Sequence, residues 1–231
     1  MVPALLYALL FLVTGLMLAR RIFPDASPGL ALPLGCGYGI AMLAAFPAVF
    51  ALGLGFGVSA VGLAGITALL ILLALVKSGV RLTGWQKNPD DIVLLVCVLP
   101  LMAVTGYLLH THILHAVDGT FHTGQSCYGD LPMHLGFIEY IAQSGEFPPT
   151  YPLLGGAHRF GYPFLCETVS SVFRILGADL RTACLLPMVP AFLSAFGMFW
   201  QLARRVLGSA AKASLAFYLF FMGSGSTRWW I

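Results

Sequence analysis

Apolar runs long enough to cross a membrane are the feature that most limits how this chain can fold. The longest, residues 30–76, contains no Lys, Arg, Asp or Glu. A helix needs about 20 apolar residues to cross a hydrocarbon core of about 30 Å, so this run is too long for one crossing. We predict two helices that are separated near residues 53–57. The glycines of the run either let neighbouring helices pack closely or only break the helix.

Composition places the whole chain in the same class. Hydrophobic residues make up 59% of it and charged residues only 9%, and the mean hydropathy is +0.90, whereas a soluble domain is about 45–50% apolar. Regular strand alternation is absent, so helices are the expected spanning elements. We predict an all-α, polytopic membrane helix bundle in a lipid bilayer. No nucleic-acid partner is expected, since the sequence has no basic nucleic-acid patch.

Six spans are expected in all. Residues 1–91 hold three of them and a cytoplasmic loop, while residues 92–231 hold the other three and an external loop over residues 110–182. Asp90 and Asp91 are expected to cap the fourth span. In chain order the predicted spans are residues 2–19, the two halves of 30–76, then 92–109, 183–203 and the short run 210–222.

The distribution of basic residues orients these spans. Basic residues favour the cytoplasmic side of a membrane, and eight of them fall on one side if every span crosses once. The N-terminus and the loop are therefore expected outside, in a bacterial inner or plasma membrane. The eight are Arg20, Arg21, Lys77, Arg81, Lys87, Arg204, Arg205 and Lys212, and the four on the other side are Arg159, Arg174, Arg181 and Arg228.

The external loop contains the most polar long stretch of the chain, residues 128–162. Within it, residues 130–143 have helical spacing, with Phe137 and Ile141 on one face. A second short helix is expected over residues 163–176, because a proline starts it and a glycine follows it. Both helices are too short to span, so we expect them to lie along the membrane surface.

Asp130 and His134 fall one turn apart on the apolar face of the first of these helices. Ionisable groups at the bilayer boundary are costly unless they bind or pair with something. The two residues are therefore candidate ligands for a substrate or for a divalent metal ion. Asp130 also precedes Leu131 and Pro132, which is the pattern of a helix N-cap, and both interpretations stay open at this point.

Histidines and cysteines near the loop leave further alternatives. The pattern of His110, His112 and His115 either collects a transition metal, with His112 and His115 as the paired ligands, or caps the end of a span. Cys127 and Cys166 both lie on the predicted outer side, where they form a disulfide or remain free thiols.

The order of elements in residues 94–208 is more specific than any single motif in it. An external span end is followed by an acidic residue at the start of an interfacial helix, then by GEFPP, a glycine pair and YP. A second short helix ending in ILGADLRTACLLP and another span come next. This order resembles the first external loop of C-type glycosyltransferases, in particular the aminoarabinose and protein O-mannosyl transferase branch.

Members of this family take a sugar from a polyprenyl-phosphate donor on the external face of the membrane. The acceptor is unknown for this chain. The resemblance places Asp130 at the family's acidic position, as general base or as metal-binding carboxylate, and here it stands alone where the family carries an acidic doublet. Arg159 and Tyr162 are implied to contact the donor phosphate, and Tyr128 and His134 are further expected substrate contacts.

Two other classes of function remain open. A transporter would place charged or polar residues within the spans, and these are nearly absent. A non-catalytic scaffold that binds a lipid or a partner through the loop differs from the transferase only in lacking turnover. C-type transferases have more spans than six, so we also expect this chain to be inactive alone, as the N-terminal part of an enzyme or until a second chain completes the fold.

Overall fold

Eight helices and one short hairpin form the part of the chain that the structure describes. The structure is a computed structural model that describes residues 1–124, 127–156, 158 and 160–223. The predicted all-α class is confirmed. The elements are α1 (Val2–Ile22), α2 (Pro28–Leu54), α3 (Val58–Lys77), α4 (Asp90–His112), β1 (His115–Val117), β2 (Thr120–His122), α5 (Cys127–Ser144), α6 (Leu165–Ile175), α7 (Leu180–Leu207) and α8 (Ala210–Met222).

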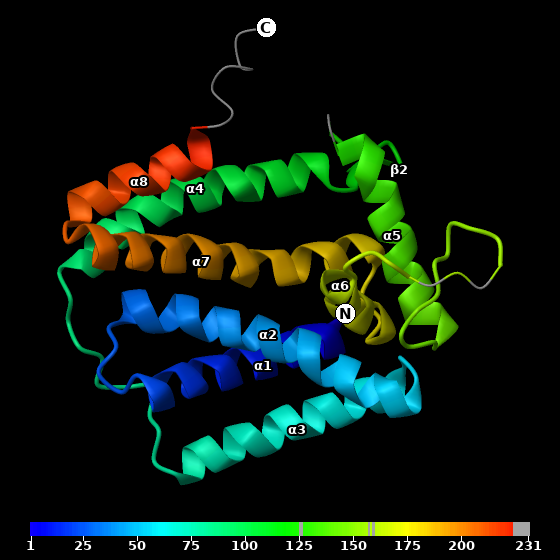
Figure 1. Ribbon diagram of the computed structural model, residues 1–231, viewed down its shortest axis with the longest axis horizontal. Coiled ribbons are helices and arrows are strands. Elements are labelled where there is room, and N and C mark those ends of the chain that lie inside the picture. The colour runs from blue at the N-terminus through cyan, green and yellow to red at the C-terminus, as the bar shows by residue number, and fades with distance from the viewer. Residues whose placement is uncertain (125–126, 157, 159, 224–231) are drawn as a thin grey trace, which may run out of the picture.

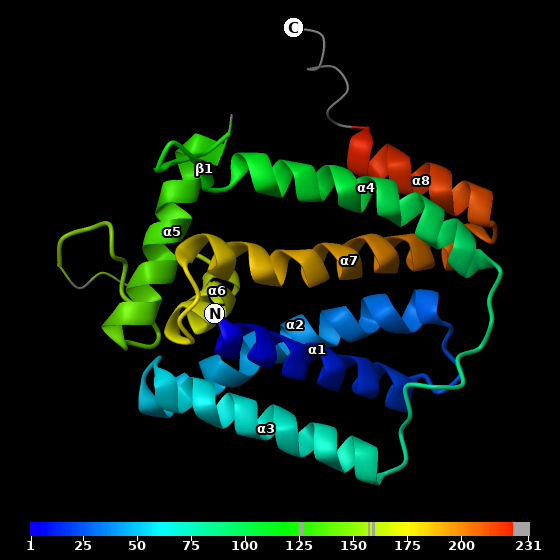
Figure 2. The same cartoon turned by 180° about the vertical axis from the view of Figure 1, so that it is seen from behind.

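Five helices, α1, α2, α3, α4 and α7, run along a common axis in Figure 1, and Figure 2 shows the same arrangement from behind. Each is long and apolar enough to cross a membrane, so the chain is an integral membrane protein. Their connections gather at two ends. We call the end with the α2–α3 turn, the hairpin, α5 and α6 the loop end, and the end with the α1–α2, α3–α4 and α7–α8 connections the basic end.

The sixth predicted span differs from the structure. α8 has 13 residues, and at about 1.5 Å per residue it reaches only about 20 Å, which is short of the bilayer core. It folds back beside α7 and α4, where Phe217 packs in one cluster with Phe196 and Trp200. Among the described residues, five helices rather than six have the length of a span.

Glycines set the contact between α1 and α2. A Cβ atom at Gly15 would lie 2.3 Å from the carbonyl oxygen of Gly35, and one at Gly39 would lie 3.0 Å from that of Phe11. Larger side chains at these positions would force the two helices apart. The prediction that glycines let the helices pack closely is confirmed here.

Glycines have the other predicted role at the turn between α2 and α3. Gly55 has a φ of 77°, in the left-handed region that favours glycine, while Cβ atoms at Gly53 and Gly57 would meet nothing within 4 Å. The N–H of Phe56 donates to the carbonyl oxygen of Gly145, just after α5, at 2.9 Å. The predicted division of the long apolar run is confirmed, and its turn helps to hold α5 in place.

Asp90 and Asp91 do not cap α4 as predicted. Its N-cap residue is Pro89, and the first N–H of the helix, that of Asp90, donates to Asn88 Oδ1 at 3.1 Å. Asp90 Oδ2 instead accepts a hydrogen bond from Arg204 Nε at 2.6 Å, and Asp91 Oδ1 accepts one from Ser27 Oγ at 2.7 Å. The two carboxylates face neighbouring helices, so they join the start of α4 to α7 and α2 at the basic end.

Candidate functional site

α5 lies across the loop end, crosswise to the five long helices, as both views show (Figures 1 and 2). α6 packs against it and also contacts α2 and α7. Several hydrogen bonds join the pair. Ser171 Oγ donates to the carbonyl oxygen of Ile138 at 2.9 Å, and Arg174 Nε donates to Glu139 Oε1 at 2.5 Å. The predicted pair of short helices is therefore present, and α6 fixes the rotation of α5.

The face that α5 buries is the one that its sequence predicts. Phe137 and Ile141 are fully buried. From α6, Val172 and Phe173 are fully buried as well, and both belong to the main hydrophobic core together with Ile141. Because both helices are buried against the bundle, their backbones are held in place, and their polar side chains have fixed positions.

A buried carboxylate, Glu167 of α6, is the centre of the site. Only 3% of its surface is exposed. Its Oε1 lies 2.5 Å from His134 Nδ1, and its Oε2 accepts a hydrogen bond from Cys166 Sγ at 2.8 Å. A carboxylate withdrawn from water is costly unless it is hydrogen-bonded, and here both of its oxygens have a donor.

The carboxylate also orients the imidazole. Because an ionised carboxylate only accepts hydrogen bonds, a neutral ring bonded to it through Nδ1 carries its proton on that nitrogen and presents a lone pair on Nε2. The His134 side chain is 30% exposed. The pair therefore combines a buried orienting group with a partly open ring, which is the arrangement of an oriented general base.

Cys166 acts as a hydrogen-bond donor in this site. Burial, followed by the hydrogen bond and the negative charge of Glu167, raises the pKa of the Cys166 thiol to about 11. The thiol is thus protonated at neutral pH and unsuited to be a nucleophile. Of the two arrangements predicted for Cys127 and Cys166, the structure has the free thiols.

Aromatic rings surround the exposed side of the imidazole. The Tyr162 ring lies 5.6 Å from the His134 ring, centroid to centroid, and both rings approach Phe137. Phe160 contacts Phe137 at 4.6 Å. These contacts keep His134 at the edge of an aromatic cluster, next to apolar surface.

An apolar groove of about 420 Å³ begins at this cluster. Its walls come from α2 and from the segment that leads into α6, and Tyr162 belongs both to the groove and to the surroundings of His134. One of its walls thus belongs to a helix that is long and apolar enough to cross a membrane. Its lining residues are Ala48, Val49, Leu52, Phe147, Tyr162, Pro163, Phe164 and Leu165.

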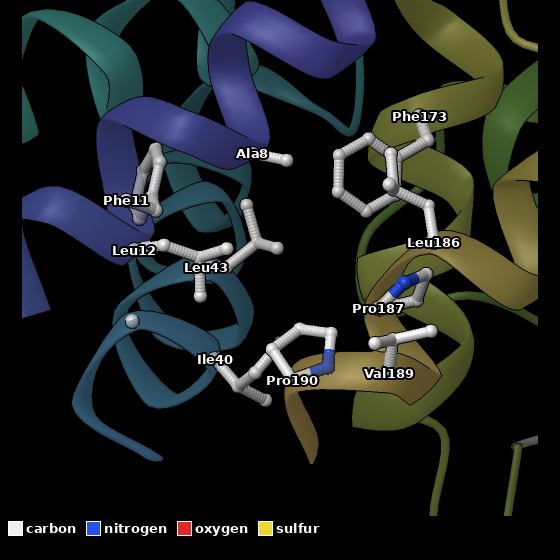
Figure 3. Close-up of a pocket in the computed structure, with 11 residues that line it drawn as sticks. Ala8, Phe11, Leu12, Ile40, Leu43, Phe173, Leu186, Pro187, Val189 and Pro190 are labelled. Carbon is white, nitrogen blue, oxygen red and sulfur yellow. The ribbon is translucent and has the colours of Figure 1, made fainter. Parts of the chain in front are cut away.

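A second apolar cavity, of about 280 Å³, lies deeper in the bundle. In Figure 3, Ala8, Phe11 and Leu43 of α1 and α2 face Phe173 of α6 and Pro187 of α7 across it. Pro187 and Pro190 lie inside α7, where a proline removes a backbone hydrogen bond and its ring crowds the preceding turn. This cavity is separate from the groove and contains no ionisable side chain in its lining.

The residues predicted for the site are only partly brought together. His134 and Tyr162 are neighbours. Asp130 is exposed and lies in the first turn of α5, and because the helix already begins at Cys127, the interpretation of Asp130 as its N-cap is wrong. The side chain of Tyr128 and all of Arg159 lie outside what the structure describes, so their predicted roles stay predictions.

The predicted pairing of histidines is different in the structure. α4 ends at His112 and the hairpin begins at His115, which turns the His115 ring towards His110 at 5.1 Å rather than towards His112. Arg181 Nη2 lies 3.1 Å from His110 Nδ1 and donates to it. Within the described ranges, no group of three or more His, Cys, Asp or Glu side chains converges to hold a metal ion, and the metal role of Asp130 and His134 stays a prediction.

Glu167 is the functional candidate that sequence reasoning missed. The signal was present, since Glu167 is the only acidic residue of α6 and lies in its first turn, on a face that is otherwise apolar or hydroxylic. Known protein families, curated proteins and solved structures were compared with this chain, and none of them matches it. Any proposal about function therefore rests on the geometry of the loop end.

Proposed function

We propose that this chain acts as a membrane glycosyltransferase that moves a sugar from a polyprenyl-phosphate donor to an acceptor at the loop end. The observation that carries the proposal is the pair of the partly exposed His134 and the buried Glu167, 2.5 Å apart, beside Tyr162, which lines an apolar groove. A lipid-linked sugar has the matching form, with a polar head to be activated and a long hydrocarbon tail to be accommodated.

His134 supplies the base in this proposal. Its Nε2 takes the proton of an acceptor hydroxyl, the freed oxygen forms a bond to the anomeric carbon of the sugar, and the polyprenyl phosphate leaves with the bonding electrons. Glu167 stabilises the imidazolium that results, because its negative charge is already placed against Nδ1. Burial of the carboxylate, which is 3% exposed, strengthens this interaction, since water screens it less than it would a surface pair.

The groove supplies the tail site. Its wall on α2 is formed by Ala48, Val49 and Leu52, in a helix that spans the bilayer, so an isoprenoid chain in the groove would remain in the membrane while its phosphate stays at the surface. Tyr162 is 41% exposed, and it adjoins both the His134 ring and the groove. It is placed to contact the head and the first isoprene units together.

Asp130 keeps a separate role. It lies one helical turn before His134 on the same side of α5, and it is exposed at the loop end. The resemblance assigns it as base or as metal-binding carboxylate. If His134 is the base, Asp130 is left to bind the acceptor or a divalent ion that neutralises the donor phosphate, and Arg159 and Tyr128 remain candidate contacts to that phosphate.

Transfer by native membrane vesicles, in which any second chain that completes the fold is also present, tests the proposal, with a labelled polyprenyl-phosphate sugar as donor. His134→Gln is expected to abolish transfer, whereas the matched control His158→Gln, an exposed histidine of the same loop, should retain it. Asp130→Asn should reduce transfer without loss of protein. Wild-type vesicles that transfer no sugar from a panel of polyprenyl-phosphate donors, or a His134→Gln variant with full activity, would contradict the proposal.

A second candidate function is a non-catalytic membrane scaffold that binds a lipid. The apolar groove and the deeper cavity support lipid binding as well as they support the transferase, because a lipid can occupy either one without any reaction. Photo-crosslinking of a polyprenyl phosphate to the groove, without any sugar transfer, would support the scaffold in place of the enzyme.

A further inference from the structure

We propose that the basic end carries a second binding site, which holds the phosphate group of an anionic phospholipid. A pocket of about 330 Å³ opens there between the ends of α1 and α3. Arg20, Arg21 and Arg81 line it, together with Ser78 and the turn that follows. The site is far along the chain from the buried pair and does not depend on the proposed transfer reaction.

One of the three arginines builds the pocket wall. Arg20 donates from Nη1 to the carbonyl oxygen of Pro24 at 2.6 Å and to that of Ala26 at 3.3 Å. It also donates to the carbonyl oxygens of Arg81 and Thr83, and its guanidinium carbon lies 4.5 Å from the centroid of the Trp85 ring. Arg20 thereby ties the α1–α2 connection to the α3–α4 connection and gives the pocket a fixed shape.

The other two arginines leave positive charge in the pocket. Among the residues that the structure describes, no carboxylate lies within ion-pair distance of Arg20, Arg21 or Arg81, whereas Arg174 and Arg204 each contact one. Three guanidinium groups around one concave surface attract an anion. Guanidinium forks match the oxygens of a phosphate group in particular.

The position of the pocket indicates a lipid rather than a soluble phosphate. α1 ends at Ile22 and α3 at Lys77, and every lining residue lies within four positions of one of these two ends. Helices that span a bilayer end where the headgroups begin. The pocket is thus at headgroup depth, with Lys77 in the last turn of α3 as additional positive charge.

Basic residues at span ends also orient a protein in the membrane, and that role alone predicts diffuse attraction rather than a defined site. A matched pair of variants distinguishes a defined lipid site from diffuse attraction. Arg21→Gln/Arg81→Gln removes two charges from the pocket, while Arg205→Gln/Lys212→Gln removes two exposed charges from the same end outside it. The pocket wall survives in the first variant, because Arg20 bonds to the Arg81 carbonyl and not to its side chain.

Native mass spectrometry of the purified full chain measures binding of individual phosphatidylglycerol and phosphatidylcholine molecules. We expect phosphatidylglycerol to bind preferentially, and its affinity to fall about 30-fold in the pocket variant but less than about 3-fold in the control. The thermal unfolding midpoint should match that of the wild type in both variants.

Three results would overturn the assignment. Equal loss of affinity in the two double variants would leave only diffuse attraction. Equal binding of phosphatidylcholine by the wild-type chain would remove the need for a net negative lipid, and this comparison requires no variant. Saturation of the site by inorganic phosphate, with no preference for phosphatidylglycerol, would identify a soluble phosphate site instead.

Discussion

The two ends of the bundle differ in how their charged side chains are partnered. At the loop end, Glu167 is 3% exposed and paired with His134, and Arg174 is paired with Glu139. The basic end has eight Lys and Arg residues against three acidic ones, and within the described residues its one ion pair joins Arg204 to Asp90. Negative charge collects at the loop end, in Asp118, Asp130, Glu139, Glu146, Glu167 and Asp179.

For Glu167 the difference follows from burial, whereas the Arg174–Glu139 pair, with side chains 28% and 26% exposed, resembles the pair at the basic end. A charge held inside packed helices must be paired, because the cost of leaving it without water exceeds what folding can supply. A charge at an exposed helix end keeps its water and needs no partner. Paired groups can therefore orient a reaction at the loop end, while unpaired guanidinium groups remain available to lipid phosphates at the basic end.

The largest expected effect concerns the side of the membrane that each end faces. A cysteine at position 144, the last residue of α5, and one at position 83, between α3 and α4, should lie on opposite sides of the membrane. A membrane-impermeant maleimide added to intact cells should therefore label the first and not the second. The experiment uses a background in which Cys127 and Cys166 are serine. Labelling of Ser144→Cys and Thr83→Cys from the same side would contradict the proposed orientation.

Elements whose signal lies within one short segment of the sequence could be predicted. The spans are visible because a bilayer demands a minimum apolar length, and the buried face of α5 is visible because Phe137 and Ile141 repeat at helical spacing. The hairpin was missed although its signal is local. Asp118 and Gly119 form a two-residue turn in which both have positive φ, which is a common hairpin sequence.

Contacts between distant segments could not be predicted in the same way. Glu167 and His134 are 33 positions apart and meet only because α6 packs on α5. Asp90 was assigned to a cap for the same reason, since nothing near it in the sequence reveals Arg204, 114 positions away. Tertiary packing supplied both partners, and it overrode the local preference for a cap.

Removing the buried carboxylate should produce the largest loss of stability. Glu167→Ala removes a buried side chain and the acceptor of the His134 Nδ1 and Cys166 Sγ donors, and we expect about 2–3 kcal/mol of destabilisation. Thermal or denaturant unfolding in detergent measures it. Glu146→Ala, at an exposed carboxylate of the same end, serves as the control, and an equal loss in both variants would show that burial does not distinguish them.

The reactivity of Cys166 tests the electrostatics of the same site with a smaller effect. Its pKa is raised to about 11, so only a small fraction is thiolate at pH 8, although the thiolate of a higher-pKa thiol is intrinsically more reactive. Alkylation by iodoacetamide should be about 10-fold slower than for an ordinary exposed thiol, and it should accelerate as pH rises towards 11. Alkylation at the ordinary rate at pH 8 would contradict the raised pKa.

The smallest effect is expected at the one ion pair of the basic end. Arg204 and Asp90 are 2.6 Å apart, but their side chains are 33% and 27% exposed, so water and salt weaken the attraction. Arg204→Gln should cost about 0.5–1 kcal/mol, and its neighbour Arg205→Gln should cost less, since no carboxylate contacts Arg205 among the described residues. High salt should reduce the difference between the two variants. If Arg204→Gln instead destabilised the chain as much as Glu167→Ala, partial exposure would not weaken a pair, and burial would no longer explain why the two ends differ.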